Sequence, residues 1–167
     1  MKKAPVLAAI LSLVAVGGCG VGGGAHHASA PKWPVWTVAT FGVSLGHPAG
    51  WKAAPGYLQR LQGKSGYVSL NALQGTGLDP RAAAQAQAGQ ALSPFGAHPQ
   101  LRAVTVDGQP GYVIMPSGGI REAEAVVLYP TAQTISGVPY RYLIVTAPAA
   151  QIMPIVRSVR FLPGKKH

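Results

Sequence analysis

The only cysteine of the chain, Cys19, lies where a bacterial lipoprotein would be cleaved and acylated. A cationic start, Lys2-Lys3, precedes an apolar run from Val6 to Val16 that has the length of a secretory h-region. The stretch Val-Gly-Gly-Cys that follows resembles a lipobox, the signal at which the thiol receives a diacylglyceryl group and becomes the mature N-terminus. The spacing therefore predicts lipid attachment at Cys19.

Two other interpretations of the N-terminus are a signal peptide in which Cys19 is incidental and a short transmembrane anchor. The apolar run is shorter than the roughly 18 residues that span a bilayer. An unmodified lone thiol would be a reactive group on a secreted chain, and both points favour lipidation. We therefore expect residues 1–18 to be a lipoprotein signal peptide and the mature chain to be anchored on the outer face of the bacterial cell membrane.

One arrangement of side chains could support nucleophilic catalysis. Ser117 stands beside Gly118 and Gly119, which could form an oxyanion hole, and His47 or His98 could act as the base. The Gly-x-Ser-x-Gly pattern is absent, however, and acids that could orient a histidine are few. A turn between two strands is the simpler interpretation.

Two further groups have a chemical and a structural interpretation. Glu122 and Glu124 are two apart on an expected strand, hence on one face, and could form a glycosidase-like carboxylate pair. Pairing with Arg121 or a cross-strand Arg141 is the simpler role. The pair His26-His27 offers only two imidazoles to a metal, so a linker is favoured there. We predict no catalytic residue, metal site or cofactor, and do not expect an enzyme.

The charge of the chain is strongly positive. Its 14 Lys and Arg against 4 Asp and Glu give a formal net charge of +10, which reflects scarce acids more than abundant bases. Attraction to anionic polymers is one interpretation, and adaptation to an acid environment, where carboxylates would be protonated, is the other. The bases are scattered without interleaved aromatic residues, which favours adaptation and argues against nucleic acid as a partner.

Length and composition indicate one folded domain behind a tether. Residues 19–35 are rich in Gly, Ala and Pro and predict a flexible tether, residues 36–163 carry the domain, and residues 164–167 are a basic tail. Within the domain, Asp107-Gly108 predicts a tight hairpin turn. Strand patterns lie at Thr37–Leu45, Tyr57–Leu61, Tyr67–Ala72, Leu101–Val106, Tyr112–Met115, Ala123–Tyr129 and Tyr140–Thr146. Arg160–Leu162 is expected to be a short final strand or a tail packed on the sheet.

Two helices are expected. Asp79 can cap the first, Pro80 suits its first position, and the pattern continues from Arg81 to Leu92. The second spans Pro148–Val159 with apolar residues at i, i+3, i+4 and i+7, although Pro154 predicts a kink or a later start. Continuous apolar runs at Val126–Leu128 and Leu143–Val145 indicate central strands covered on both faces.

Short motifs recur in a fixed order over residues 41–161. They are Gly42-Val43-Ser44-Leu45, Pro48-x-Gly50-Trp51, Gly66-Tyr67-Val68, Pro94-Phe95-Gly96, Val106-Asp107-Gly108-Gln109, Met115-Pro116-Ser117, Leu128-Tyr129-Pro130 and Gly137-x-x-Tyr140-x-Tyr142. This order is similar to that of PsbP-like domains of spore-forming Gram-positive bacteria. Such domains occur as lipoproteins and as extracellular tails of BlaR-type membrane metallopeptidases, although this chain lacks the His-Glu-x-x-His pair of the protease segment.

The resemblance implies an α+β fold, an antiparallel sheet with helices on both faces, as in the photosystem II extrinsic protein and the Ran-binding Mog protein. It also implies a binding or accessory module without shared catalytic residues. We therefore predict a lipid-anchored extracytoplasmic binding or accessory domain, with an envelope protein as a candidate partner. A structural role in an envelope or spore-coat assembly and weak binding of anionic wall polymers are the alternatives.

If the domain has a binding face, the sequence places it where aromatic and cationic groups gather near strand ends. The alternative is that the tyrosines of this group only complete the core. The candidate residues are Tyr129, Tyr140, Arg141 and Tyr142.

Overall fold

The computed structural model describes residues 32–75 and 77–163. The predicted signal peptide, Cys19, the histidine pair and the basic tail lie outside these residues. Trp33 packs against the core, and the Pro34 carbonyl accepts a hydrogen bond from the His47 backbone N–H at 3.0 Å. The fold therefore begins before residue 36, where the sequence pattern placed its start.

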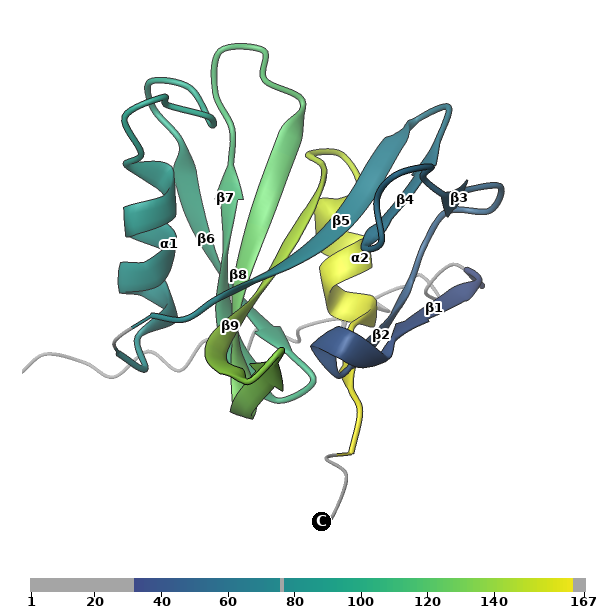
Figure 1. The fold of residues 1–167 in the computed structure, drawn as a ribbon. Coiled ribbons are helices and arrows are strands. Elements are labelled where there is room, and N and C mark those ends of the chain that lie inside the picture. Colours follow the sequence, from purple (N-terminus) through teal and green to yellow (C-terminus); the bar gives the residue numbers. More distant parts are fainter. Residues whose placement is uncertain (1–31, 76, 164–167) are drawn as a thin grey trace, which may run out of the picture.

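The described residues form a mixed fold with ten strands in two antiparallel sheets and two α-helices (Figure 1). The predicted α+β class and antiparallel pairing are confirmed, but the strands divide between two sheets where one was expected. The smaller sheet has the order β1-β2-β10, with β1 at Val35–Val38, β2 at Val43–Gly46 and β10 at Arg160–Phe161. A short 3₁₀ helix, η1 (Ala39–Phe41), divides the single strand expected over Thr37–Leu45.

The larger sheet has the order β3-β4-β5-β9-β8-β7-β6. The predicted central strands, β8 and β9, lie inside it, and both run longer than their apolar patterns. The bounds are β3 (Lys52–Ala53), β4 (Arg60–Gly63), β5 (Gly66–Leu73), β6 (Gln100–Val106), β7 (Gln109–Met115), β8 (Glu122–Ile135) and β9 (Val138–Pro148).

The first helix, α1, spans Pro80–Ala88 and has the predicted start. The Asp79 side chain accepts a hydrogen bond from the Arg81 backbone N–H at 2.8 Å, and Pro80 occupies the first position. The helix ends before the predicted Leu92, because Gly89 follows Ala88 and glycine is a poor helix former.

The second helix, α2, spans Ile152–Ser158. Pro154 lies in its first turn, where a backbone N–H has no intrahelical partner, so the proline is accommodated without interrupting the helix. Ile152, Ile155 and Val156 are fully buried, as their spacing predicted.

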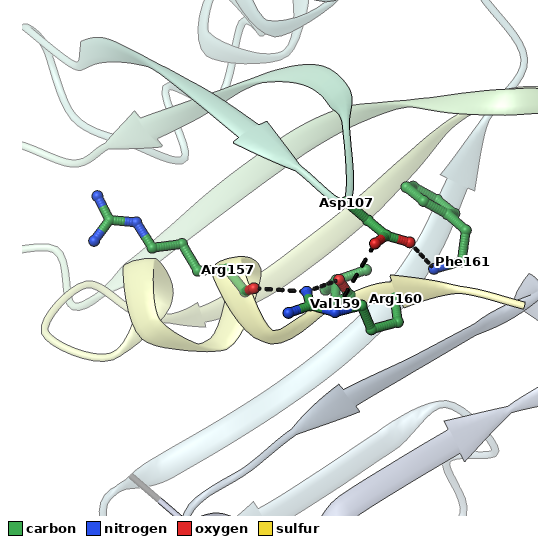
Figure 2. Close-up of polar contacts among 5 residues, drawn as sticks. All are labelled: Asp107, Arg157, Val159, Arg160 and Phe161. Atoms are coloured by element: carbon green, nitrogen blue, oxygen red, sulfur yellow. Dashed lines mark hydrogen bonds and ion pairs between the residues drawn. The ribbon is translucent and has the colours of Figure 1, made fainter. Parts of the chain in front are cut away.

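The turn between β6 and β7 confirms the hairpin predicted at Asp107-Gly108. Both residues have positive φ, 49° and 80°, and Val106 pairs with Gln109 across the turn. Asp107 also contacts β10: its Oδ2 accepts a hydrogen bond from the Phe161 backbone N–H at 2.9 Å, and its Oδ1 lies 3.9 Å from Arg160 Nε (Figure 2).

Two apolar clusters stabilise the larger sheet, and neighbouring residues of one strand divide between them. Val113 belongs to the cluster that contains the buried side chains of α2, whereas Ile114 belongs to the cluster that contains Ala84 of α1. Because successive residues of a strand point to opposite faces, the two clusters lie on opposite faces of the sheet.

Candidate functional site

A row of polar side chains crosses the sheet face on which α1 packs. Arg60, Ser69, Thr146 and Glu124 are successive register partners on β4, β5, β9 and β8. Residues directly opposite each other in antiparallel strands share a face, so these four side chains form one line, named here the polar row. The next partner of Glu124 is Ile114 on β7, which lies in the α1 cluster. The polar row therefore ends where the cover of α1 begins.

The extent of α1 explains why this part of the sheet stays open. The helix packs mainly on β6, β7 and β8. In Figure 1 it lies at the β6 and β7 side of the sheet, away from β3 and β4. A cavity of about 240 Å³ lies over β4, β5, β9 and the start of β8 and is lined by all four residues of the polar row. Tyr57, Asn71 and Ile144 also line it, which adds aromatic, amide and aliphatic surface.

Arg60 is held by two aromatic rings. Its guanidinium carbon lies 4.3 Å from the ring centre of Tyr57 and 4.0 Å from that of Tyr67. Such cation–π contacts fix the position of the guanidinium without providing an acceptor in its plane. Its Nε is buried and has no hydrogen-bond partner among the described residues. The side chain is therefore a positioned donor with unused capacity.

Glu124 is the acidic end of the polar row. Its Oε2 accepts a long hydrogen bond of 3.5 Å from the Thr146 hydroxyl, and its buried Oε1 has no partner among the described residues. Burial raises the pKa of Glu124 to about 7, against a small lowering from the Thr146 contact. Near neutral pH this carboxyl group therefore exchanges between its neutral and charged forms.

The predicted salt bridges of Glu122 and Glu124 with Arg121 or Arg141 are wrong. In the described part of the chain, the one ion pair within 4.0 Å joins Arg160 to Asp107, at 3.9 Å. Glu124 on β8 lies opposite Thr146 on the neighbouring strand β9. Arg141 is exposed beside a bulge of β8 between Leu128 and Gln133.

The Ser117 hydroxyl does not contact the imidazole ring of His47 or of His98 in the structure. The Ser117 hydroxyl accepts a hydrogen bond from the backbone N–H of His98 at 3.0 Å, while the His47 ring contacts the Pro48 carbonyl. Gly118 and Gly119 have φ of 67° and 81°, which fits the predicted turn between strands.

The four residues of the predicted binding face do not share a face. Tyr129, only 5% exposed, packs edge-on against Phe161 in the α2 cluster, whereas Tyr142, 1% exposed, lies in the α1 cluster. Both tyrosines are part of the core, and Tyr129 also lines a cavity of about 290 Å³ together with Arg141. Tyr140 and Arg141 do lie together, along an open cavity of about 650 Å³ that also borders Gly75.

Sequence reasoning singled out Glu124 but missed its neighbours in the polar row. A signal was present in β5, where Tyr67, Ser69 and Asn71 alternate with apolar residues and so mark a solvent-facing side. Arg60 carried no comparable signal, because its rings come from a loop and from the next strand.

No group of three or more His, Cys, Asp and Glu side chains that could hold a metal occurs in residues 32–75 and 77–163. No helix in the same residues is long and apolar enough to cross a membrane. Neither a scan against protein-family models nor a search of the curated proteins finds a match to this chain.

Proposed function

We propose that this chain is a lipid-anchored extracytoplasmic binding domain, without catalytic activity, that holds a small ligand in the cavity of the polar row. One observation carries the binding part. Two buried polar atoms without partners among the described residues, Arg60 Nε and Glu124 Oε1, belong to side chains that line the same cavity. Buried polar atoms are nearly always hydrogen-bonded, so this arrangement suits a site completed by a ligand or ordered water.

The placement of the cavity supports the same proposal. Its side chains stand on paired strands of the large sheet, which keep polar groups in position better than loops do. The half of the face under α1 is lined mainly by apolar side chains, among them Ile114 and Val126.

Anchoring and family complete the proposal. The lipobox-like stretch that ends at Cys19 supports attachment to the outer face of the membrane. The motif order supports a PsbP-like sandwich with helices on both faces of the sheet, and the division of Val113 and Ile114 between the α2 and α1 clusters is compatible with it.

Binding is tested by thermal unfolding of the full chain in detergent against a panel of small anionic, cationic and neutral metabolites. A ligand of the cavity raises the melting temperature of the wild type but not that of Ser69→Phe, which fills the cavity. Thr105→Phe, on the exposed edge strand β6, is the matched control and keeps the response. The absence of any ligand-induced shift across the panel contradicts the proposal. Recovery of a chemically altered ligand contradicts its non-catalytic part.

Anchoring is tested separately at Cys19. We expect the mature wild type to partition into detergent with a lipid mass on its N-terminal peptide, and Cys19→Ala to accumulate as an uncleaved precursor. A soluble wild type without lipid contradicts this part alone.

A further inference from the structure

We propose that the cavity of the polar row takes a small monocarboxylate, which Arg60 binds through its guanidinium N–H groups and Glu124 contacts by a hydrogen bond. This inference rests on the proposed binding function and names its ligand class.

The donor geometry at Arg60 suits a carboxylate. A guanidinium presents N–H donors in one plane, in a fork that matches the two oxygens of a carboxylate. Tyr57 and Tyr67 hold this group by contacts of 4.3 and 4.0 Å to its central carbon, so little conformational freedom is lost on binding.

The charge of the cavity favours a single negative charge. Arg60 is the one cationic residue and Glu124 the one acidic residue among the side chains that line it. The other titratable groups on this sheet face are Lys52 on β3, Tyr67 on β5, Tyr140 and Tyr142 on β9, Glu122 on β8 and Tyr112 on β7. Tyr57 adds a phenol from the loop before β4, and Asp79 and Arg81 lie at the start of α1. With Glu124 neutral, the lining carries a charge of +1, which one carboxylate balances.

The dimensions of the cavity limit the ligand. Arg60 and Glu124 are separated by three interstrand spacings, about 14 Å between their Cα atoms, which their two side chains partly fill. The volume of about 240 Å³ accommodates a ligand of a few heavy atoms, and Ile144 provides an apolar wall for its carbon chain.

Glu124 makes the binding depend on pH. Burial raises the pKa of Glu124 to about 7, so below that pH the group is neutral and can donate its O–H to a ligand oxygen. Above it, the charged carboxylate offsets the charge of Arg60, loses its donor and repels the ligand. Affinity for a monocarboxylate should therefore decrease as the pH rises through 7.

The test is isothermal titration calorimetry of the full chain in detergent with butyrate and benzoate, in buffers free of carboxylate and phosphate. We expect saturable binding at pH 5.5 that is at least tenfold weaker at pH 8.5. Arg60→Gln abolishes it, whereas the matched control Arg102→Gln, an exposed arginine of β6, retains it. Glu124→Gln binds equally at both pH values, because its amide donates a hydrogen bond and carries no charge. This readout stays decisive if Arg60→Gln does not fold.

Several outcomes overturn the inference. Wild-type binding that does not change between the two pH values removes the role of Glu124, and binding that survives Arg60→Gln removes the role of Arg60. Failure of both carboxylates, with binding of ethylamine, methyl phosphate or a neutral member of the metabolite panel, rejects the ligand class but leaves the proposed binding function. Failure of the carboxylates and of the whole panel rejects both.

Discussion

One face of the large sheet has two halves that differ in cover and in chemistry. Under α1, Ile114 and Val126 are fully buried among apolar neighbours. Beyond the edge of the helix, the same strand β8 places Glu124 two residues from Val126, opposite Thr146. The change from apolar to polar side chains thus follows the limit of the helix rather than the limit of a strand. Where no helix covers the sheet, polar side chains can bind a ligand with little loss of buried apolar area.

The largest expected effect is a loss of stability in the covered half, the part of the sheet face that lies under α1. Ile114→Ala should lower the free energy of unfolding by about 2 to 5 kcal/mol, because it leaves a cavity in a fully packed cluster. Ser69→Ala, the matched truncation in the open half, should change it by less than about 0.5 kcal/mol. Urea unfolding of both variants measures the difference. Similar losses at the two sites would mean that the halves do not differ in packing.

The next effect concerns Glu124, the carboxyl group at the border of the two halves. Its pKa is about 7 in the folded chain and 4.5 as the ordinary value, so the folded state binds the extra proton between these values. The stability that depends on protonated Glu124 is therefore fully present below pH 4.5 and is lost as the pH rises through 7. Glu124→Gln should remove this loss and stabilise the protein at pH 8.5 by about 1 to 3 kcal/mol, with little effect at pH 4.

Unfolding of the wild type and Glu124→Gln across pH 4 to 8.5 checks this expectation, with Glu122→Gln on the same strand as the control. A variant that follows the wild-type pH profile would show that Glu124 is ionised and well solvated. The open half would then extend further over β8 than the cavity indicates.

A smaller effect concerns the helix that forms the cover. Asp79→Ala removes the side chain that accepts from the Arg81 backbone N–H at 2.8 Å, and should lower the free energy of unfolding by about 1 kcal/mol. Asp79→Asn keeps an acceptor and should lose less. Hydrogen exchange should localise the loss to the first turn of α1. An equal loss in both variants would assign the effect to charge instead of capping.

Sequence reasoning located features that are fixed within a few residues. Asp79-Pro80 gave the start of α1, Asp107-Gly108 the β6–β7 turn, and the spacing of Ile152, Ile155 and Val156 the buried side of α2. Each depends on backbone geometry or on the period of one element.

Features that depend on strand pairing could not be obtained in this way. The polar row joins Arg60, Ser69, Glu124 and Thr146, which meet only through the register of four strands. The second sheet pairs β10, at the end of the domain, with β2 near its start. The four residues of the predicted binding face do not all lie together, because Tyr129 and Tyr142 pack on opposite faces of the sheet. The bulge in β8 begins beside Tyr129.

The smallest expected effect concerns the contact between Tyr67 and Arg60 in the open half, the part of the sheet face that α1 does not cover. Tyr67→Leu removes one of the two rings that contact Arg60 and should lower stability by about 0.5 kcal/mol, the size of an exposed cation–π contact. Tyr67→Phe keeps the ring and should be neutral. A double-mutant cycle with Arg60→Gln isolates the contact. A coupling near zero would mean that the tyrosines only border the cavity. A measurable coupling supports the inference that the rings hold Arg60 ready for a ligand.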